Sequence, residues 1–162
     1  MTIPELLHAM ARTPDCRLFP ASGLPTVEAG HVLTDDLAEF YELCGGAVLY
    51  EHKDYPIMIV PAEQFRLSNP VIVGPVWERD DISASWYIVA DDLKGGAYLT
   101  IDLSPERAGR CYDSSPYAHA IAGSSPIIAR SFRELLERLY ENRGEYWYWL
   151  RPDFEGLGDA YD

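Results

Sequence analysis

Cysteine, long apolar runs and basic residues are scarce in this sequence, and each scarcity excludes a class of protein. Only three cysteines occur among 162 residues, and no two form a Cys-x-x-Cys pair. A zinc site or a dithiol redox motif is therefore not expected, and the reducing cytoplasm is the natural setting. No apolar run approaches the roughly 18 residues of a membrane span, so no membrane association is expected. The first residues lack a basic stretch before an apolar run, so we expect no signal peptide and a cytoplasmic location.

Basic side chains are outnumbered two to one by acidic ones. The sequence has 13 lysines and arginines against 26 aspartates and glutamates, which gives a formal net charge of −13. A field of this sign repels phosphate backbones, so we expect no direct binding to nucleic acid. The same field would attract a basic protein and accelerate its encounter with this chain. The alternative is that the acidity serves only solubility.

The rest of the composition is typical of one folded domain. Hydrophobic residues make up 48% of the chain, including 11 tyrosines and 4 tryptophans, which is unlike a disordered protein. A chain of this length can bury a core without help from disulfides or metal. We expect a single domain over residues 1–152, followed by an acidic, flexible tail over residues 153–162.

Three segments have the apolar spacing and the caps of amphipathic helices. Residues 2–12 begin with a Thr-x-x-Glu capping box, and residues 131–142 begin with Ser-x-x-Glu. Residues 35–44 follow a threonine cap and end at Gly45 and Gly46. In each segment the apolar side chains recur at the spacing that puts them on one helix face. The sequence therefore predicts two helices near the N-terminus and one near the C-terminus.

Short β-prone runs fill the space between the second and the last of these helices. They are residues 47–51, 56–60, 71–73, 86–90, 97–103 and 109–113. Turn residues between successive runs predict antiparallel hairpins, and the prolines around residues 71–73 place that run at a sheet edge. Residues 14–31 are rich in glycine, proline and serine and are predicted to form a loop. Helices segregated from a meander of strands indicate an α+β fold.

Side chains capable of chemistry are scattered along the chain. None of the four histidines forms a metal-binding pair, so neither a metal nor a cofactor is expected. The aspartates near the strand ends, Asp102 among them, lack the spacing of a calcium loop and are interpreted as turn residues. No glycine-rich phosphate loop or nucleophile elbow occurs. We predict no catalytic residue, although an enzyme in which His119 and Cys111 converge in a cleft stays open.

An aromatic run follows the last predicted helix, over residues 146–149. Tyrosine and tryptophan dominate the energetics of protein interfaces, so this run could contact a partner. A segment that follows a core-packing helix more often folds back onto the sheet, and we favour that interpretation.

Four segments resemble, in the correct order, the SMI1/KNR4 or SUKH superfamily. They are residues 33–47, 59–65, 86–98 and 128–136. The first is similar to the family's "L-P-x-x-L-x-x-F-Y-x-x-x-N-G" helix, with Thr34 in place of the usual proline. The last resembles its "I-A-x-S-F-x-E-F-L" closing helix, and the whole match covers residues 31–142. The resemblance implies an antiparallel, curved multi-stranded sheet flanked by N-terminal and C-terminal helices, with no shared catalytic residues.

The resemblance also implies a binding module. Bacterial members are largely immunity proteins that neutralise a polymorphic toxin, often a nuclease or a deaminase. We therefore expect a cytoplasmic immunity protein that binds a basic toxin domain through an acidic sheet surface with apolar anchors. The candidate contact residues are Trp77, Glu78, Asp80, Asp81, Trp86, Asp91, Asp92 and Asp113. Two alternatives stay open: a regulatory or scaffold protein that uses the same surface for an endogenous partner, and a small hydrolase with a non-local active site.

Overall fold

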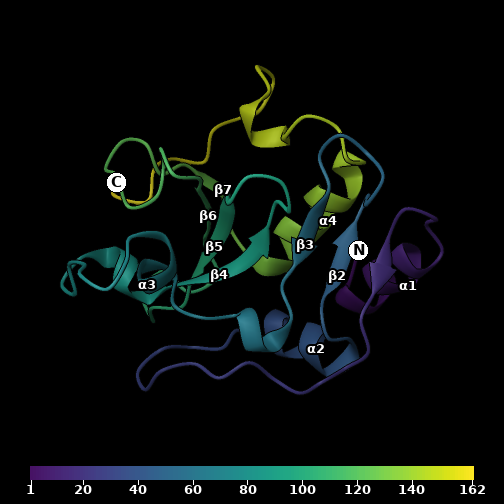
Figure 1. Cartoon of the computed structure of the whole chain (residues 1–162), viewed down its shortest axis with the longest axis horizontal. Helices are drawn as coiled ribbons and strands as arrows, with labels where there is room; N and C mark the ends of the chain where they lie inside the picture. Colours follow the sequence, from purple (N-terminus) through teal and green to yellow (C-terminus); the bar gives the residue numbers. More distant parts are fainter.

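The computed structural model describes residues 1–162, and its centre is a seven-stranded antiparallel sheet (Figure 1). The strands are β1 (Arg17–Leu18), β2 (Ala47–Leu49), β3 (Ile57–Ile59), β4 (Trp86–Asp91), β5 (Tyr98–Asp102), β6 (Cys111–Ser114) and β7 (Ile127–Ala129). They lie side by side in sequence order, so every connection joins neighbouring strands. The longest pairing, between β4 and β5, contains a bulge between Ile88 and Ala90. The predicted α+β class is confirmed.

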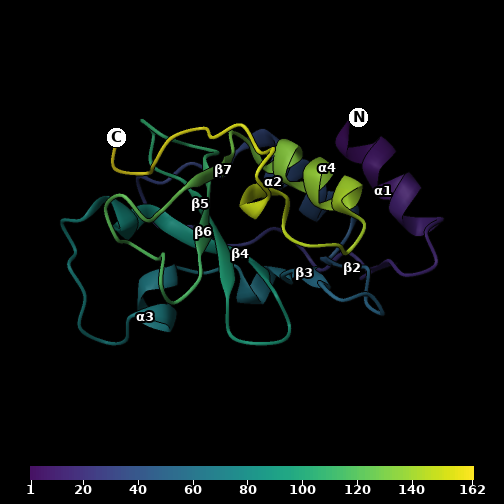
Figure 2. The same cartoon turned by 90° about the horizontal axis from the view of Figure 1, so that it is seen from above.

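Four α-helices surround this sheet. They are α1 (Ile3–Ala11), α2 (Asp35–Leu43), α3 (Ser68–Ile72) and α4 (Phe132–Asn142). Figure 2 shows α1, α2 and α4 together on one side of the sheet and α3 on the other. Three short 3-10 helices, η1 (Ala62–Gln64), η2 (Ile82–Ser85) and η3 (Tyr148–Leu150), complete the structure. None of the helices has the length and apolar character needed to cross a bilayer.

The three predicted helices form where their caps place them. Thr2 Oγ1 accepts a hydrogen bond from the Glu5 amide, and Ser131 Oγ accepts one from the Glu134 amide. These contacts satisfy amides that have no partner within the helix. At the start of α2, Asp36 takes this role, because its carboxylate accepts bonds from the amides of Leu37 and Arg133. Asp36 thereby links the first turn of α2 to the first turn of α4.

The main core lies between the sheet and the three helices α1, α2 and α4. It contains 31 buried residues, with the Phe40 and Phe132 rings in edge contact at 5.0 Å. Each such buried side chain stabilises the fold by about 1.5–3 kcal/mol relative to an exposed one. The hydroxyl of Tyr41 donates to the Val60 carbonyl at 2.6 Å, so this polar group is satisfied within the core. The amphipathic faces expected for the three helices are confirmed.

The opposite face of the sheet is organised around the carboxylate of Asp102, which is completely buried. It accepts five hydrogen bonds of 2.7–3.1 Å, from Ser85 Oγ, Trp86 Nε1, Tyr112 Oη, Arg107 Nε and the Ser104 amide. These donors come from η2 (Ile82–Ser85), β4, β6 and the loop after β5. The interpretation of Asp102 as a turn residue is therefore wrong.

Three segments differ from expectation. Residues 71–73 do not form an edge strand; α3 occupies this region, and Pro70 lies in its first turn, where a missing amide costs little. Part of the predicted loop over residues 14–31 pairs with β2 as the short strand β1. Strand β7 was not anticipated, and it forms the edge beside β6. All three elements are five residues long or shorter, too short to show a clear apolar period.

The acidic tail differs from the frayed segment that we expected. Ala160 is only 2% exposed, and its amide donates to the Ser125 carbonyl at 2.9 Å. The hydroxyl of Tyr161 donates to Asp81 at 2.7 Å, and its ring contacts Trp86. The tail therefore packs on the polar face of the sheet, and Figure 1 shows the C-terminus beside the loop that precedes β7.

Replacement of Asp102 by alanine should lower the free energy of unfolding by about 3–5 kcal/mol. The change leaves the Trp86 indole N–H, the Tyr112 hydroxyl and the Arg107 guanidinium without their shared acceptor. Urea denaturation followed by tryptophan fluorescence measures the difference. Asp80→Ala is the control, because Asp80 is exposed and its loss should cost under about 0.5 kcal/mol. Equal losses in the two variants would contradict the role given to Asp102.

Candidate functional site

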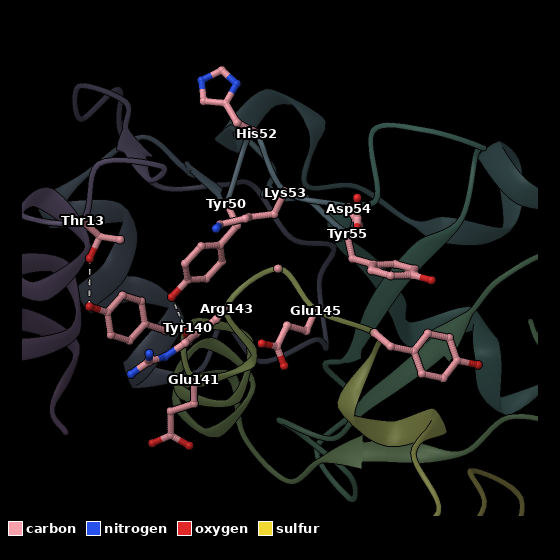
Figure 3. Close-up of a pocket in the computed structure, with 12 residues that line it drawn as sticks. Thr13, Tyr50, His52, Lys53, Asp54, Tyr55, Tyr140, Glu141, Arg143 and Glu145 are labelled. Carbon is pink, nitrogen blue, oxygen red and sulfur yellow. Dashed lines mark hydrogen bonds between the residues drawn. The ribbon is translucent and has the colours of Figure 1, made fainter.

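A cavity of about 840 Å³ lies between the β2–β3 loop and the C-terminal end of α4 (Figure 3). Four tyrosines, Tyr50, Tyr55, Tyr140 and Tyr146, form much of its wall, and we call it the tyrosine cavity. In Figure 3 the β2–β3 loop supplies one wall and the end of α4 the other.

The shape of the tyrosine cavity depends on the residues that end α4. Arg143 and Gly144 both have positive φ angles, of 55° and 71°, so the chain leaves the helix in a left-handed turn. A Cβ atom on Gly144 would lie 2.5 Å from the Cβ of Lys53, so only glycine lets the β2–β3 loop approach this closely. The Tyr55 amide then donates to the Gly144 carbonyl at 3.1 Å. The residues that end the helix are evident in the sequence, but the loop that packs against them is not.

The polar groups of the tyrosine cavity suit binding. The hydroxyl of Tyr50 donates to the Tyr140 carbonyl, and the Tyr140 hydroxyl contacts Thr13 Oγ1 at 2.9 Å. Burial raises the pKa of Tyr50 above its ordinary value, so this phenol stays protonated. The lining contains neither serine nor cysteine. The arrangement can therefore hold a ligand by hydrogen bonds and aromatic contact.

A second, smaller pocket of about 160 Å³ lies beside the first, and we call it the indole pocket. Its walls include Trp147, Trp149, Tyr98, Asp92 and Asp113. The two indole rings are stacked, with centroids 5.1 Å apart and planes 13° from parallel. Trp149 Nε1 donates to the Asp113 carboxylate at 3.0 Å, which fixes this indole against β6.

The two pockets form one continuous surface. The Tyr55 ring is in edge contact with Tyr146 on the side of the tyrosine cavity and with Trp147 on the side of the indole pocket, at 5.6 and 5.4 Å. We call the two pockets and Tyr55 together the contact face. Core packing, the interpretation favoured for the aromatic run, holds for Trp149, which is 8% exposed, but not for Tyr146, which is 48% exposed.

The structure separates the predicted contact residues into two groups at opposite ends of β4. Trp77, Glu78, Asp80 and Asp81 lie before the strand, in the segment between α3 and η2. Asp91, Asp92 and Asp113 lie at its other end, roughly 17 Å away at about 3.3 Å per residue. Only Asp92 and Asp113 line a pocket of the contact face.

Several of these residues have structural partners. Trp86 is completely buried and donates its indole N–H to Asp102, so its assignment as an exposed apolar anchor is wrong. Asp81 caps η2 by accepting bonds from the Ser83 amide and hydroxyl. Trp77 is half-buried, with the Arg79 guanidinium 4.8 Å from its ring. Glu78 and Asp80 are exposed.

The sequence did not indicate Tyr55 as a site residue, and it did not indicate that Trp147 and Asp113 line the same pocket. The aromatic run was visible in the sequence, but its partners come from strands and from the β2–β3 loop, about 35 to 90 residues away along the chain. Only the order of the strands in the sheet brings these segments together. Clusters of tyrosine and tryptophan near strand ends were the available signal.

The enzyme alternative depended on His119 and Cys111 meeting in a cleft. Cys111 is buried with its thiol directed at the carbonyls of Gly109 and Ser131, and burial raises its pKa. No hydrogen bond joins it to His119. The thiol is therefore held in its unreactive, protonated form.

His119 instead lies between Ser114 and Asn69. Its Nδ1 is 3.0 Å from Ser114 Oγ and its Nε2 is 2.6 Å from Asn69 Oδ1. The three side chains are buried, and Ser114 is also bonded to Thr100 at 2.8 Å. Neither the tyrosine cavity nor the indole pocket reaches them. This row of groups serves to connect α3 with β5 and β6. Elsewhere in the chain, no three metal-ligating side chains converge on a common point.

Comparison with known proteins gives two matches. The model of the family described as "SMI1 / KNR4 family (SUKH-1)" matches residues 28–138. A curated protein of Bacillus subtilis (strain 168), named "Immunity protein YokJ", is 56% identical over 162 residues, covering 100% of this chain and 97% of the relative. No solved structure is significantly similar. The aromatic run at residues 146–149 lies beyond the family match but within the full-length similarity.

The buried His119 predicts a pH dependence of stability. Burial lowers its pKa from 6.5 to about 4, so below pH 6.5 the unfolded chain binds a proton that the folded chain does not. The free energy of unfolding therefore has its full value from neutral His119 above pH 6.5, and this contribution is lost as the pH falls toward 4. We expect the wild type to lose about 3 kcal/mol more than His119→Gln between pH 7 and pH 4, measured by urea denaturation. Parallel pH profiles for the two proteins would contradict this assignment.

Proposed function

The chain belongs to the SMI1/KNR4 family (SUKH-1), and we propose that it is an immunity protein that binds a cognate bacterial toxin and neutralises it. The observation that supports this function most strongly is the 56% identity, over the full chain, with the protein named "Immunity protein YokJ". Similarity that covers both chains almost completely includes the contact face as well as the core. The function therefore rests on the whole molecule rather than on a shared segment.

We further propose that neutralisation occurs by direct binding, without catalysis. The contact face offers two pockets, hydrogen-bonding groups and aromatic rings, of which Tyr146 is exposed and Tyr55 and Trp147 are half-buried. Exposed aromatic side chains around a concave surface are typical of the residues that dominate binding energy in protein complexes. A partner seated there would be held by Tyr55, Tyr146 and Trp147.

The charge of the chain favours a basic toxin domain, such as a nuclease or a deaminase that itself binds nucleic acid. The net charge of −13 attracts a positively charged partner over a distance of about one Debye length. On the contact face, the acids Asp54, Glu141 and Glu145 outnumber the cations Lys53 and Arg143 in the tyrosine cavity. Asp92 and Asp113 line the indole pocket, which has no lysine or arginine in its lining. An acidic surface of this kind would cover the nucleic-acid-binding surface of such a toxin.

The test uses the toxin domain encoded beside this gene. Co-expression should restore growth to cells that produce the toxin, and the two proteins should co-purify. We expect the association rate to fall at least about tenfold between 50 and 500 mM salt, because screening shortens the reach of the acidic field. Absence of both protection and co-purification would contradict the proposed function for that toxin.

The contact face is tested by Tyr146→Ala, with Tyr117→Ala as the matched control. Both tyrosines are exposed, at 48% and 90%, but Tyr117 lies in the loop after β6, outside the lining of both pockets. We expect Tyr146→Ala to weaken toxin binding about tenfold or more, with little change for Tyr117→Ala, as measured by calorimetry. Equal effects of the two substitutions would exclude the tyrosine cavity as the contact surface.

A further inference from the structure

We propose that the indole pocket is a binding site for a single arginine side chain, which the toxin inserts when the two proteins associate. This inference rests on the proposed function, because it identifies the part of the partner that the contact face recognises. It follows from the charge, the aromatic walls and the size of the pocket.

The pocket has negative charge that the chain itself does not neutralise. Asp92 and Asp113 both line it, and neither takes part in any of the six ion pairs of the structure. The nearest lysine in sequence, Lys94, directs its ammonium group to the Asp54 carbonyl at 2.8 Å instead. Two half-buried carboxylates without a cation favour a positively charged occupant.

The hydrogen bonds of these carboxylates leave capacity for a ligand. Asp92 accepts the amides of Lys94 and Gly95 through Oδ1, and its Oδ2 has no hydrogen-bond partner. Asp113 accepts the Ser115 amide through one oxygen and Trp149 Nε1 through the other, and each oxygen keeps a further lone pair. Both groups are therefore held in place by the chain before any ligand arrives.

The aromatic walls favour a guanidinium over an ammonium. Arginine stacks its planar, weakly hydrated guanidinium on aromatic rings and can bond two acceptors at once. The indole pocket provides rings from Trp147, Trp149 and Tyr98 next to the two carboxylates. Lysine is a compact and strongly hydrated charge, so it gains less from such walls.

The size of the pocket limits the occupant to one side chain. Its volume of about 160 Å³ is well below the roughly 300–1,000 Å³ of pockets that enclose a drug-sized molecule. A small pocket beside the larger tyrosine cavity suits an anchor side chain within a protein interface. The toxin surface would cover the tyrosine cavity while one arginine enters the indole pocket.

A small-molecule experiment tests the pocket without the toxin. The probe is n-butylguanidinium, compared with n-butylurea, which has the same shape without the charge, and with n-butylammonium. We expect the indole N–H signals of Trp147 and Trp149 in heteronuclear NMR spectra to shift saturably with n-butylguanidinium, and at least about threefold more weakly with the other two compounds. If n-butylurea shifted the signals as much as n-butylguanidinium does, the pocket would not be a cation site. If n-butylammonium bound more strongly, the side chain that the pocket prefers would be lysine and not arginine.

Charge-removing variants locate the site. Asp92→Asn and Asp113→Asn each remove one charge from the pocket. Asp92→Asn keeps the single oxygen that accepts the amides of Lys94 and Gly95, so the pocket should keep its shape. Asp113→Asn keeps an acceptor for only one of the Ser115 amide and the Trp149 indole N–H, so Asp92→Asn is the decisive variant. Asp80→Asn is the matched control, since it removes one charge from an exposed site at the other end of β4. We expect the first two to weaken n-butylguanidinium binding at least about threefold and toxin binding about tenfold, with no effect of the control beyond a small change in association rate.

The two proposals fail in distinguishable ways. If toxin binds but neither n-butylguanidinium nor the two pocket variants has an effect, the arginine site is wrong and the immunity function stands. If n-butylguanidinium binds and Asp92→Asn weakens it, but the toxin neither binds nor is neutralised, the cation site stands and the proposed partner is wrong.

Discussion

The central strands are held together on their polar face by one buried carboxylate. Asp102 accepts hydrogen bonds from β4 through Trp86 and from β6 through Tyr112, while Arg107 supplies the opposite charge. A buried charge without these partners would destabilise the fold by several kcal/mol, so the five donors and the acceptor must be present together. β4 and β5 form the most extensive pairing of the sheet, so this pairing also fixes the position of the strand ends that lie farthest from Asp102. The turn that contains Asp92 is one of those ends.

Three regions of the fold have different roles. The apolar face packs on α1, α2 and α4 and supplies most of the stabilisation by burial. The polar face is closed by α3, by His119 and by the C-terminal tail, which covers Trp86 through Tyr161. The end of the sheet near α4 keeps the exposed Tyr146 ring and the half-buried rings of Tyr55 and Trp147 beside two pockets. A surface built on such well-connected strands is preorganised, so little conformational entropy is lost when a partner binds.

Local patterns in the sequence predicted the parts of the structure that local interactions determine. The capping boxes at Thr2 and Ser131, and the apolar stripes behind them, are satisfied within one helix and its immediate neighbour. Trp86 was not recognised as buried, because the apolar run over β4 does not show what covers the second face of the sheet. Its environment depends on Asp102 and on a tail 75 residues away, at Tyr161. The same argument applies to the indole pocket, whose two carboxylates come from β6 and from the β4–β5 turn.

Negative charge and aromatic contacts act on different steps of binding. On the contact face, the same carboxylates supply the charge and hold the aromatic and turn groups in place. Long-range attraction by the net charge accelerates encounter, whereas desolvated ring contacts slow dissociation. Asp113 takes part in both, because it is charged and also fixes the Trp149 indole through Nε1. Asp92 likewise is charged and orders the β4–β5 turn through two amides. Since the same carboxylates define the shape of the pocket and its potential, a partner that matches the charge but not the shape would associate quickly and leave quickly. Selectivity among basic proteins would then arise from the fit at Trp147 and Tyr55 rather than from charge.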